Sequence, residues 1–180
     1  MFRTWLVVGC CAILTACSSV NSALQRDPTA IAMLAPTEGN TASGVVEFRQ
    51  DGDTMLVSIR IDGLEPYASH GLHIHEIGDC RAPDASSAGG HFNPRGSEHG
   101  GPHSPTRHAG DLGNIQADSS GPAQAEIEVS GISLGTGEES IIGRSVIVHS
   151  GPDDLVSQPS GNAGARIACG LISKNPDKFF

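Results

Sequence analysis

The sequence predicts an all-β fold, an eight-stranded antiparallel Greek-key β-barrel or sandwich with two long functional loops. Short segments with alternating or β-branched residues recur along the chain, and turn residues separate them. No stretch has a convincing helical period. The 23 glycines and 11 prolines also argue against long helices, because both residue types are poor helix formers.

The expected strands follow one another with turns or loops between them. Alternation is clearest in MLVSIRI at 55–61 and in AEIEVS at 125–130, where every second residue can face a core. Turn residues at 38–40, 51–53 and 120–122 separate neighbouring strands. The eight expected strands are 29–35, 42–50, 54–62, 70–76, 111–117, 123–130, 144–150 and 166–172.

Two long segments lack a strand pattern. Residues 77–110 are rich in Gly, Pro, Ser and His, and residues 151–165 are rich in Gly, Pro and Ser. Loops of this length in a compact domain usually have a function. Each follows closely on a strand that ends in or near a histidine, so we expect the two loops to meet over one site.

The N-terminal region predicts export. Residues 1–16 contain one Arg and an apolar run, the pattern of a signal peptide. The end of this run, Leu14 to Cys17, resembles a bacterial lipobox, so Cys17 is the expected lipidation site. Localisation in the cell envelope follows, on the periplasmic side of the outer membrane if the cell is Gram-negative. The alternative is cleavage a little downstream, which would leave a soluble protein.

Length and charge indicate how the rest of the chain is organised and which partners are unsuited to it. Residues 17–28 are polar and patternless and predict a flexible spacer, 29–173 fit one domain, and 174–180 form a tail without an assigned role. The net charge of −9 and the lack of basic clusters argue against nucleic acid as a partner. Beyond residue 17, the cysteines are Cys80 and Cys169, which are expected to pair in an exported protein. Two buried thiols are the alternative.

Histidines mark the expected site. Seven of the eight histidines lie between His70 and His108. His73 and His75 stand two residues apart, so on a strand both imidazoles face one side while Leu72 and Ile74 face the other. His149 ends a second apolar strand, SVIVH. Imidazole is the commonest metal ligand and suits copper and zinc, so the pattern predicts a metal site.

Six motifs occur in a fixed order: GLHIHE, GGHFNP, HGGP, RHAGDLGN, VIVH and GNAGARIACG. Together they closely resemble the copper/zinc superoxide dismutase family, and the resemblance runs from about Thr29 to Ile172. It implies dismutation of superoxide to dioxygen and hydrogen peroxide, with copper alternately reduced and reoxidised, as protection of the cell envelope. A lone HxH pair would be weak evidence, because cupins and other metal-handling proteins also have one.

The resemblance also implies a role for individual residues. Asp153 would accept hydrogen bonds from ligands of both metals, and Arg166 would hold superoxide beside copper. His91 would bridge the metals and supply a proton to the reaction, and Cys80 and Cys169 would form the family disulfide. The implied ligands are His73, His75, His91 and His149 for copper, and His91, His99, His108 and Asp111 for zinc.

Some questions stay open at this level. A copper/zinc-binding lipoprotein without turnover is the main alternative function, and a cupin metalloenzyme is a weaker one. His70 matches a structural histidine of the family, while His103 has no counterpart and is expected to be an exposed loop residue. Residues 150–165 contain no Lys or Arg, so Arg81, Arg95 or Arg107 would have to add positive potential. The oligomeric state, monomer or homodimer, is not predicted.

Overall fold

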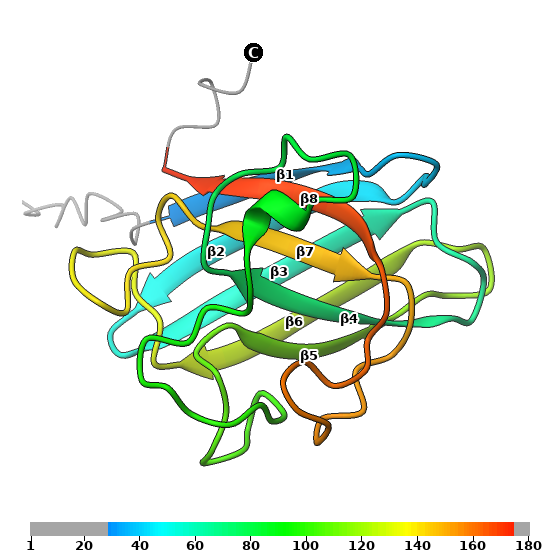
Figure 1. Ribbon diagram of the computed structural model, residues 1–180. Coiled ribbons are helices and arrows are strands. Elements are labelled where there is room, and N and C mark those ends of the chain that lie inside the picture. Colours follow the sequence, from blue (N-terminus) through cyan, green and yellow to red (C-terminus); the bar gives the residue numbers. More distant parts are fainter. Residues whose placement is uncertain (1–28, 175–180) are drawn as a thin grey trace, which may run out of the picture.

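The computed structural model describes residues 29–174 (Figure 1). The predicted signal peptide, Cys17, the spacer at 17–28 and all but the first residue of the tail lie outside the described residues. Within 29–174, the all-β prediction is confirmed, and every strand bound lies within one residue of its expected position. The strands are β1 (Thr29–Pro36), β2 (Ser43–Asp51), β3 (Thr54–Asp62), β4 (Ser69–His75), β5 (Asp111–Gln116), β6 (Ala123–Ser130), β7 (Ser145–His149) and β8 (Arg166–Ser173).

The strands form one antiparallel, nearly closed barrel. Their order is β5-β4-β7-β8-β1-β2-β3-β6, so β3 pairs with β6 although β4 and β5 lie between them in the sequence. This crossover is the Greek-key feature. The two end strands approach each other where Ala117, just after β5, bridges to Ala123 at the start of β6. The barrel therefore leaves little exposed strand edge, which limits pairing with other chains.

Alternating side chains fill the barrel. In β3 the buried residues are Met55, Val57, Ile59 and Ile61, with less buried residues between them. Such alternation is expected when one face of an antiparallel sheet meets the core and the other meets water. β7 differs, because all five of its residues are buried. Its outer face must therefore be covered by other parts of the chain.

The two long connections provide that cover. They are 76–110, largely green in Figure 1, and 150–165, in orange; both extend over the part of the barrel that β4, β5 and β7 form. The first contains a short 3-10 helix, η1 (Ser86–Ala88), that the sequence did not predict. Within residues 29–174, no helix has the length and apolar character required to cross a membrane.

Candidate metal centre

Four histidines from three parts of the chain meet outside the barrel wall. His73 and His75 come from β4, His149 ends β7, and His91 lies opposite His75 in an isolated β-bridge. One ligand atom from each lies within 4.8 Å of all the others. We call this group the four-histidine cluster. Leu72 and Ile74, the alternate residues of β4, are fully buried in the apolar core, so the strand anchors the two imidazoles to the barrel.

Hydrogen bonds fix which nitrogen of each ring is free. The Nδ1 atoms of His75 and His149 donate to the carbonyl oxygens of Gly89 and Gly164, at 2.9 and 3.1 Å. A carbonyl only accepts, so these Nδ1 atoms carry the hydrogen and each Nε2 keeps a lone pair. The buried nitrogens without a hydrogen-bond partner in the described chain include His73 Nδ1 and the Nε2 atoms of His75, His91 and His149. Unpaired buried lone pairs that converge on one point fit a metal ion.

Burial favours the neutral form of three of these imidazoles, those of His75, His91 and His149. It lowers the pKa of His91 to about 4, despite the opposing effect of Asp111, and the pKa of His149 to about 3. Burial, together with the neighbouring His91, also holds the pKa of His75 well below its usual value. Neutral imidazole is the metal-binding form, so the four-histidine cluster is suited to a metal ion at neutral pH.

His91 also belongs to a second group, with His99, His108 and Asp111, which we call the His–Asp cluster. The Nδ1 atoms of the three histidines lie 2.9, 3.1 and 3.3 Å from Asp111 Oδ1, and those of His91 and His108 lie 3.4 Å apart. Tetrahedral zinc with ligands at about 2.0–2.1 Å separates those ligands by about 3.3 Å. The donor set and the spacing both fit zinc.

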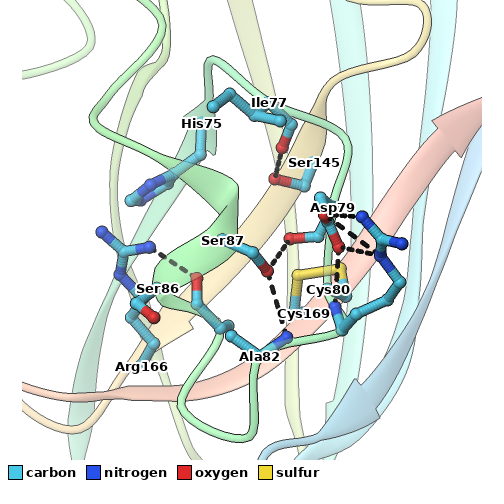
Figure 2. The surroundings of a disulfide bond; sticks show 12 residues. His75, Ile77, Asp79, Cys80, Ala82, Ser86, Ser87, Ser145, Arg166 and Cys169 are labelled. Carbon is cyan, nitrogen blue, oxygen red and sulfur yellow. Dashed lines mark hydrogen bonds and ion pairs between the residues drawn. A yellow bond between two sulfur atoms is a disulfide. The ribbon is translucent and has the colours of Figure 1, made fainter.

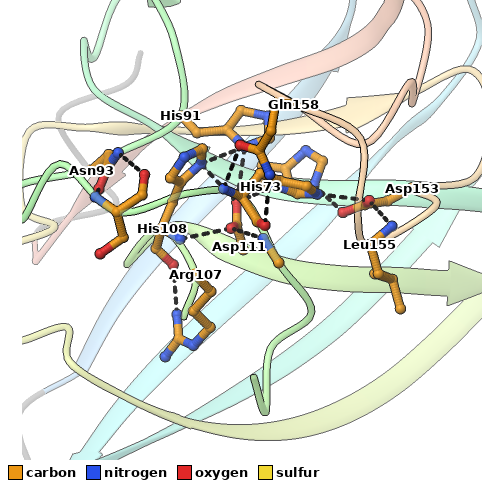
Figure 3. Close-up of polar contacts among 12 residues, drawn as sticks. His73, His91, Asn93, Arg107, His108, Asp111, Asp153, Leu155 and Gln158 are labelled. Atoms are coloured by element: carbon orange, nitrogen blue, oxygen red, sulfur yellow. Dashed lines mark hydrogen bonds and ion pairs between the residues drawn. The ribbon is translucent and has the colours of Figure 1, made fainter. Parts of the chain in front are cut away.

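Asp111 is fixed by the backbone around it. Its Oδ2 accepts the N–H groups of Gly100 at 3.1 Å and His108 at 2.8 Å, so Oδ1 faces the three imidazoles (Figure 3). Although burial raises the pKa of Asp111, hydrogen bonds with His108 and His91 outweigh that effect and hold the pKa far below its usual range. The carboxylate is therefore a permanent negative charge for a cation.

Asp153 connects the two clusters. Its Oδ2 lies 2.8 Å from His73 Nε2 and its Oδ1 lies 2.9 Å from His99 Nε2, and both side chains of each pair are fully buried. Asp153 thus orients one ring from each cluster, an arrangement that strengthens metal binding.

Two carboxamides hold this bridge by the backbone, and the sequence did not predict either. The Asn114 side chain accepts from Asp153 N at 2.7 Å and donates to Asp153 O at 2.8 Å. Gln158 binds the backbone N–H and C=O of His99 in the same way, at 2.8 and 3.1 Å (Figure 3). Asn114 stands in the GDLGN motif, which contributed to the family resemblance and so marked this position. Nothing near Gln158 in the sequence indicates its contact.

Arg166, at the start of β8, reaches toward the four-histidine cluster. Its guanidinium donates to the carbonyl oxygens of Ala85 and Gly89, each at 2.6 Å, on either side of η1. Burial lowers the pKa of Arg166 while Asp84 acts in the opposite direction, and Arg remains charged at any physiological pH. Arg166 also lines a pocket of about 550 Å³, and its positive charge is near enough to help lower the pKa of both His75 and His149.

The other basic residues that the sequence suggested already have partners. Arg81 is paired with Asp79, Arg95 with Glu139, and Arg107 donates to the backbone carbonyls of His108, Ala109 and Ser130. Arg166, and none of these three, is among the main charges that lower the pKa of both His75 and His149. Arg166 is therefore the arginine for which the structure provides a place beside the four histidines.

The remaining expected residues occupy distinct places. His70 is buried and its Nδ1 donates to His149 O at 2.8 Å, so it supports the β4–β7 pair and lies outside both clusters. His103 is exposed. Cys80 and Cys169 form a disulfide, which joins the first long connection to β8 (Figure 2). The alternative of two buried thiols does not hold in the structure.

The comparisons with known proteins agree with this geometry. Residues 42–172 match the family model of copper/zinc superoxide dismutase. The chain belongs to this family. A curated relative, the "Copper chaperone for superoxide dismutase" of Rattus norvegicus, is 44% identical over 156 residues, which cover 82% of this chain and 55% of the relative. The chain thus spans about half the length of that relative.

Proposed function

We propose that this protein is a copper/zinc superoxide dismutase. The observation that carries the proposal is Arg166, a cation held beside the four-histidine cluster by two backbone carbonyls, where it forms neither part of the cluster nor an ion pair within the described chain. A protein that only stores metal has no use for a fixed positive charge at that point. An enzyme acting on a small anion does, because the charge attracts and orients the substrate.

The two clusters would hold the two metals of the family. The four-histidine cluster would bind copper and the His–Asp cluster would bind zinc, with His91 in both. Copper, when bound, supplies a one-electron redox couple, so that one superoxide is oxidised to dioxygen and another is reduced to peroxide. The imidazole of His91 is the side chain positioned to hold a proton at Nε2 for the peroxide, because its Nδ1 faces the His–Asp cluster.

The second candidate function is copper and zinc binding without turnover. The rat relative is named as a copper chaperone, and this supports the alternative. The two functions differ in their need for Arg166. Ligand geometry alone is required for metal binding, whereas catalysis on an anion also requires the positive charge.

The deciding experiment replaces that charge. Arg166→Ile in protein loaded with copper and zinc should keep both metals and lower the dismutation rate roughly five- to thirty-fold, as expected from losing an attraction of about 1–2 kcal/mol. Added salt should slow the wild type more than the variant, because salt screens the same attraction. Arg60→Ile, on the outer face of β3, is the matched control and should change nothing. A wild type without dismutation activity at full metal content would favour the binding function.

We also propose that the protein is exported and anchored to a membrane through lipid on Cys17. The lipobox-like ending of the predicted signal peptide supports this. Cys17→Ser should move the protein from the membrane fraction to the soluble fraction. Unchanged partitioning would rule out the anchor and leave the enzymatic proposal intact.

A further inference from the structure

Ser87, in the middle of η1, holds the turn that carries Cys80. Its hydroxyl donates to the carbonyl of Asp79 at 2.8 Å and accepts from the N–H of Ala82 at 3.1 Å (Figure 2). These two partners lie on either side of Cys80 in the sequence. One side chain therefore ties η1 to both ends of the disulfide-bearing turn.

The same short helix provides both acceptors of Arg166. Ala85 immediately precedes η1 and Gly89 immediately follows it, and their carbonyl oxygens receive the guanidinium. Ala85 has a φ of 56°. For a residue with a Cβ this left-handed conformation is unfavourable, so surrounding contacts have to maintain it. The direction of the Ala85 carbonyl thus depends on how η1 is held.

Two kinds of contact hold η1 in place, which are the apolar packing of its alanines and the hydrogen bonds of the Ser87 hydroxyl. Ala85 and Ala88 are fully buried in a small cluster with Ile147 and Cys169, which places the helix directly against the disulfide. This contact limits how far η1 can move away from β8. It does not by itself fix rotation of the helix, because alanine methyl groups make no directional interaction. The two hydrogen bonds of Ser87 are directional, as is the backbone bond from Ile77 N–H to the Ala88 carbonyl at 3.0 Å, but only those of Ser87 lead to the residues on either side of Cys80.

We propose that Ser87 is a positioning residue for Arg166. It links the Cys80–Cys169 disulfide to the carbonyls that orient the guanidinium, so that the covalent constraint sets the position of the charge beside the four-histidine cluster. The inference rests on the proposed role of Arg166 in binding a small anion. It adds that the strength of this binding depends on a hydroxyl that contacts neither the anion nor the metals.

The test measures anion binding rather than turnover. Azide, a small monovalent anion, is titrated into copper- and zinc-loaded protein, and its dissociation constant is read from the change in the Cu(II) absorption spectrum. Ser87→Ala should weaken azide binding by about three- to ten-fold, the range expected for losing one or two neutral hydrogen bonds. Metal content and the disulfide should stay intact. Ser119→Ala, which removes an exposed hydroxyl from the turn between β5 and β6, should leave the constant unchanged.

A second pair of variants isolates the hydroxyl. Ser87→Thr and Ser87→Val have nearly the same volume, but only Thr keeps the group that makes both bonds. Ser87→Thr should bind azide more tightly than Ser87→Val by the same factor that separates wild type from Ser87→Ala. Equal dissociation constants for Ser87→Thr and Ser87→Val would overturn the inference, even if one of the other variants fails to fold.

The double variant shows whether the effect passes through the guanidinium. In an Arg166→Ile background, Ser87→Ala should add nothing to the loss of azide affinity, because residues that act as a unit are non-additive. An equal, additive loss would overturn the inference, as would unchanged azide affinity in Ser87→Ala alone. A wild type that shows this coupling but no dismutation would refute the proposed function and leave the role of Ser87 standing.

Discussion

His75 and Arg166 hydrogen-bond to the same carbonyl oxygen, that of Gly89. His75 Nδ1 approaches it at 2.9 Å and Arg166 Nη2 at 2.6 Å. One backbone atom thus fixes both the orientation of a candidate copper ligand and the place of the charge next to it. A shift of Gly89 would move both side chains together, so metal geometry and anion attraction are coupled in this fold.

The shared position of His91 predicts unequal effects of two ligand substitutions. His91→Ala should lower the content of both copper and zinc, because this ring belongs to both clusters. His149→Ala should lower copper and spare zinc. Elemental analysis of dialysed protein gives both contents, with the exposed His103→Ala as control. Identical losses for His91→Ala and His149→Ala would show that His91 is not a bridge.

Gly161 predicts a steric test of the Asp153 bridge. A Cβ at this position would clash with Asp153 Oδ1 and would lie 2.7 Å from His99 Nε2, and φ is +65°. Gly161→Ala should therefore separate His99 from Asp153 and weaken zinc binding about 10–100-fold, as for loss of other residues that orient a ligand. Competition with a chromophoric chelator measures the affinity.

The matched control for this variant is Gly39→Ala. Gly39 has a similar φ of +76° but nothing within 4 Å of its added Cβ, so it reports backbone strain alone. If both variants lost the same zinc affinity, the contact with Asp153 and His99 would not be the cause.

The buried histidines predict a pH dependence for metal-free protein. His91 has a pKa of about 4 in the folded state and His149 about 3, against about 6.5 in an unfolded chain. Between these values the unfolded state binds more protons, so the free energy of unfolding should fall as pH falls below about 6.5. The slope is at most about 1.4 kcal/mol per pH unit for each histidine.

Urea unfolding of metal-free protein at pH 7 and pH 5 measures this change. His149→Asn removes one of the buried titrating rings and should flatten the dependence, whereas His103→Asn should not. A free energy of unfolding that stays constant from pH 7 to pH 5 would contradict the prediction.

The disulfide predicts a loss of stability on removal. It closes a loop between positions 89 apart in the sequence. Cys80→Ser should lower the free energy of unfolding by about 2–5 kcal/mol, because the unfolded chain gains conformational freedom. Urea unfolding without reductant gives the value, and wild type in strong reductant should resemble the variant. Stability equal to that of the oxidised wild type would mean that the bond adds no net constraint.

The strands were predictable because most of them obey a local rule. In β3 and β6 the side chains alternate between core and solvent, and this alternation is visible within a few neighbouring residues. β7 is buried on both faces and shows no alternation, so only its β-branched content indicated a strand. η1 was missed because three residues are too few to show a helical period.

The site was predictable where spacing within a motif carries the information. The expected copper and zinc residues do lie together in two clusters, although their roles as ligands stay predictions. Asp153 was expected as a supporting residue, but two others, Gln158 and Asn114, were not. Gln158 contacts His99 across 59 positions and Asn114 contacts Asp153 across 39. No local pattern records such a contact, because it depends on how two distant loops fold over each other.

The place of β8 in the barrel sets an order of assembly. All seven residues of the two clusters precede position 150, yet β8, the last strand within residues 29–174, pairs with both β1 and β7. Until residues 166–173 are available, β1 and β7 each lack a neighbour, and Arg166 and Cys169 are missing as well. The sheet therefore cannot close before β8 is available, so folding relies on contacts between β8 and β1, which are far apart in the sequence, and is expected to be slow.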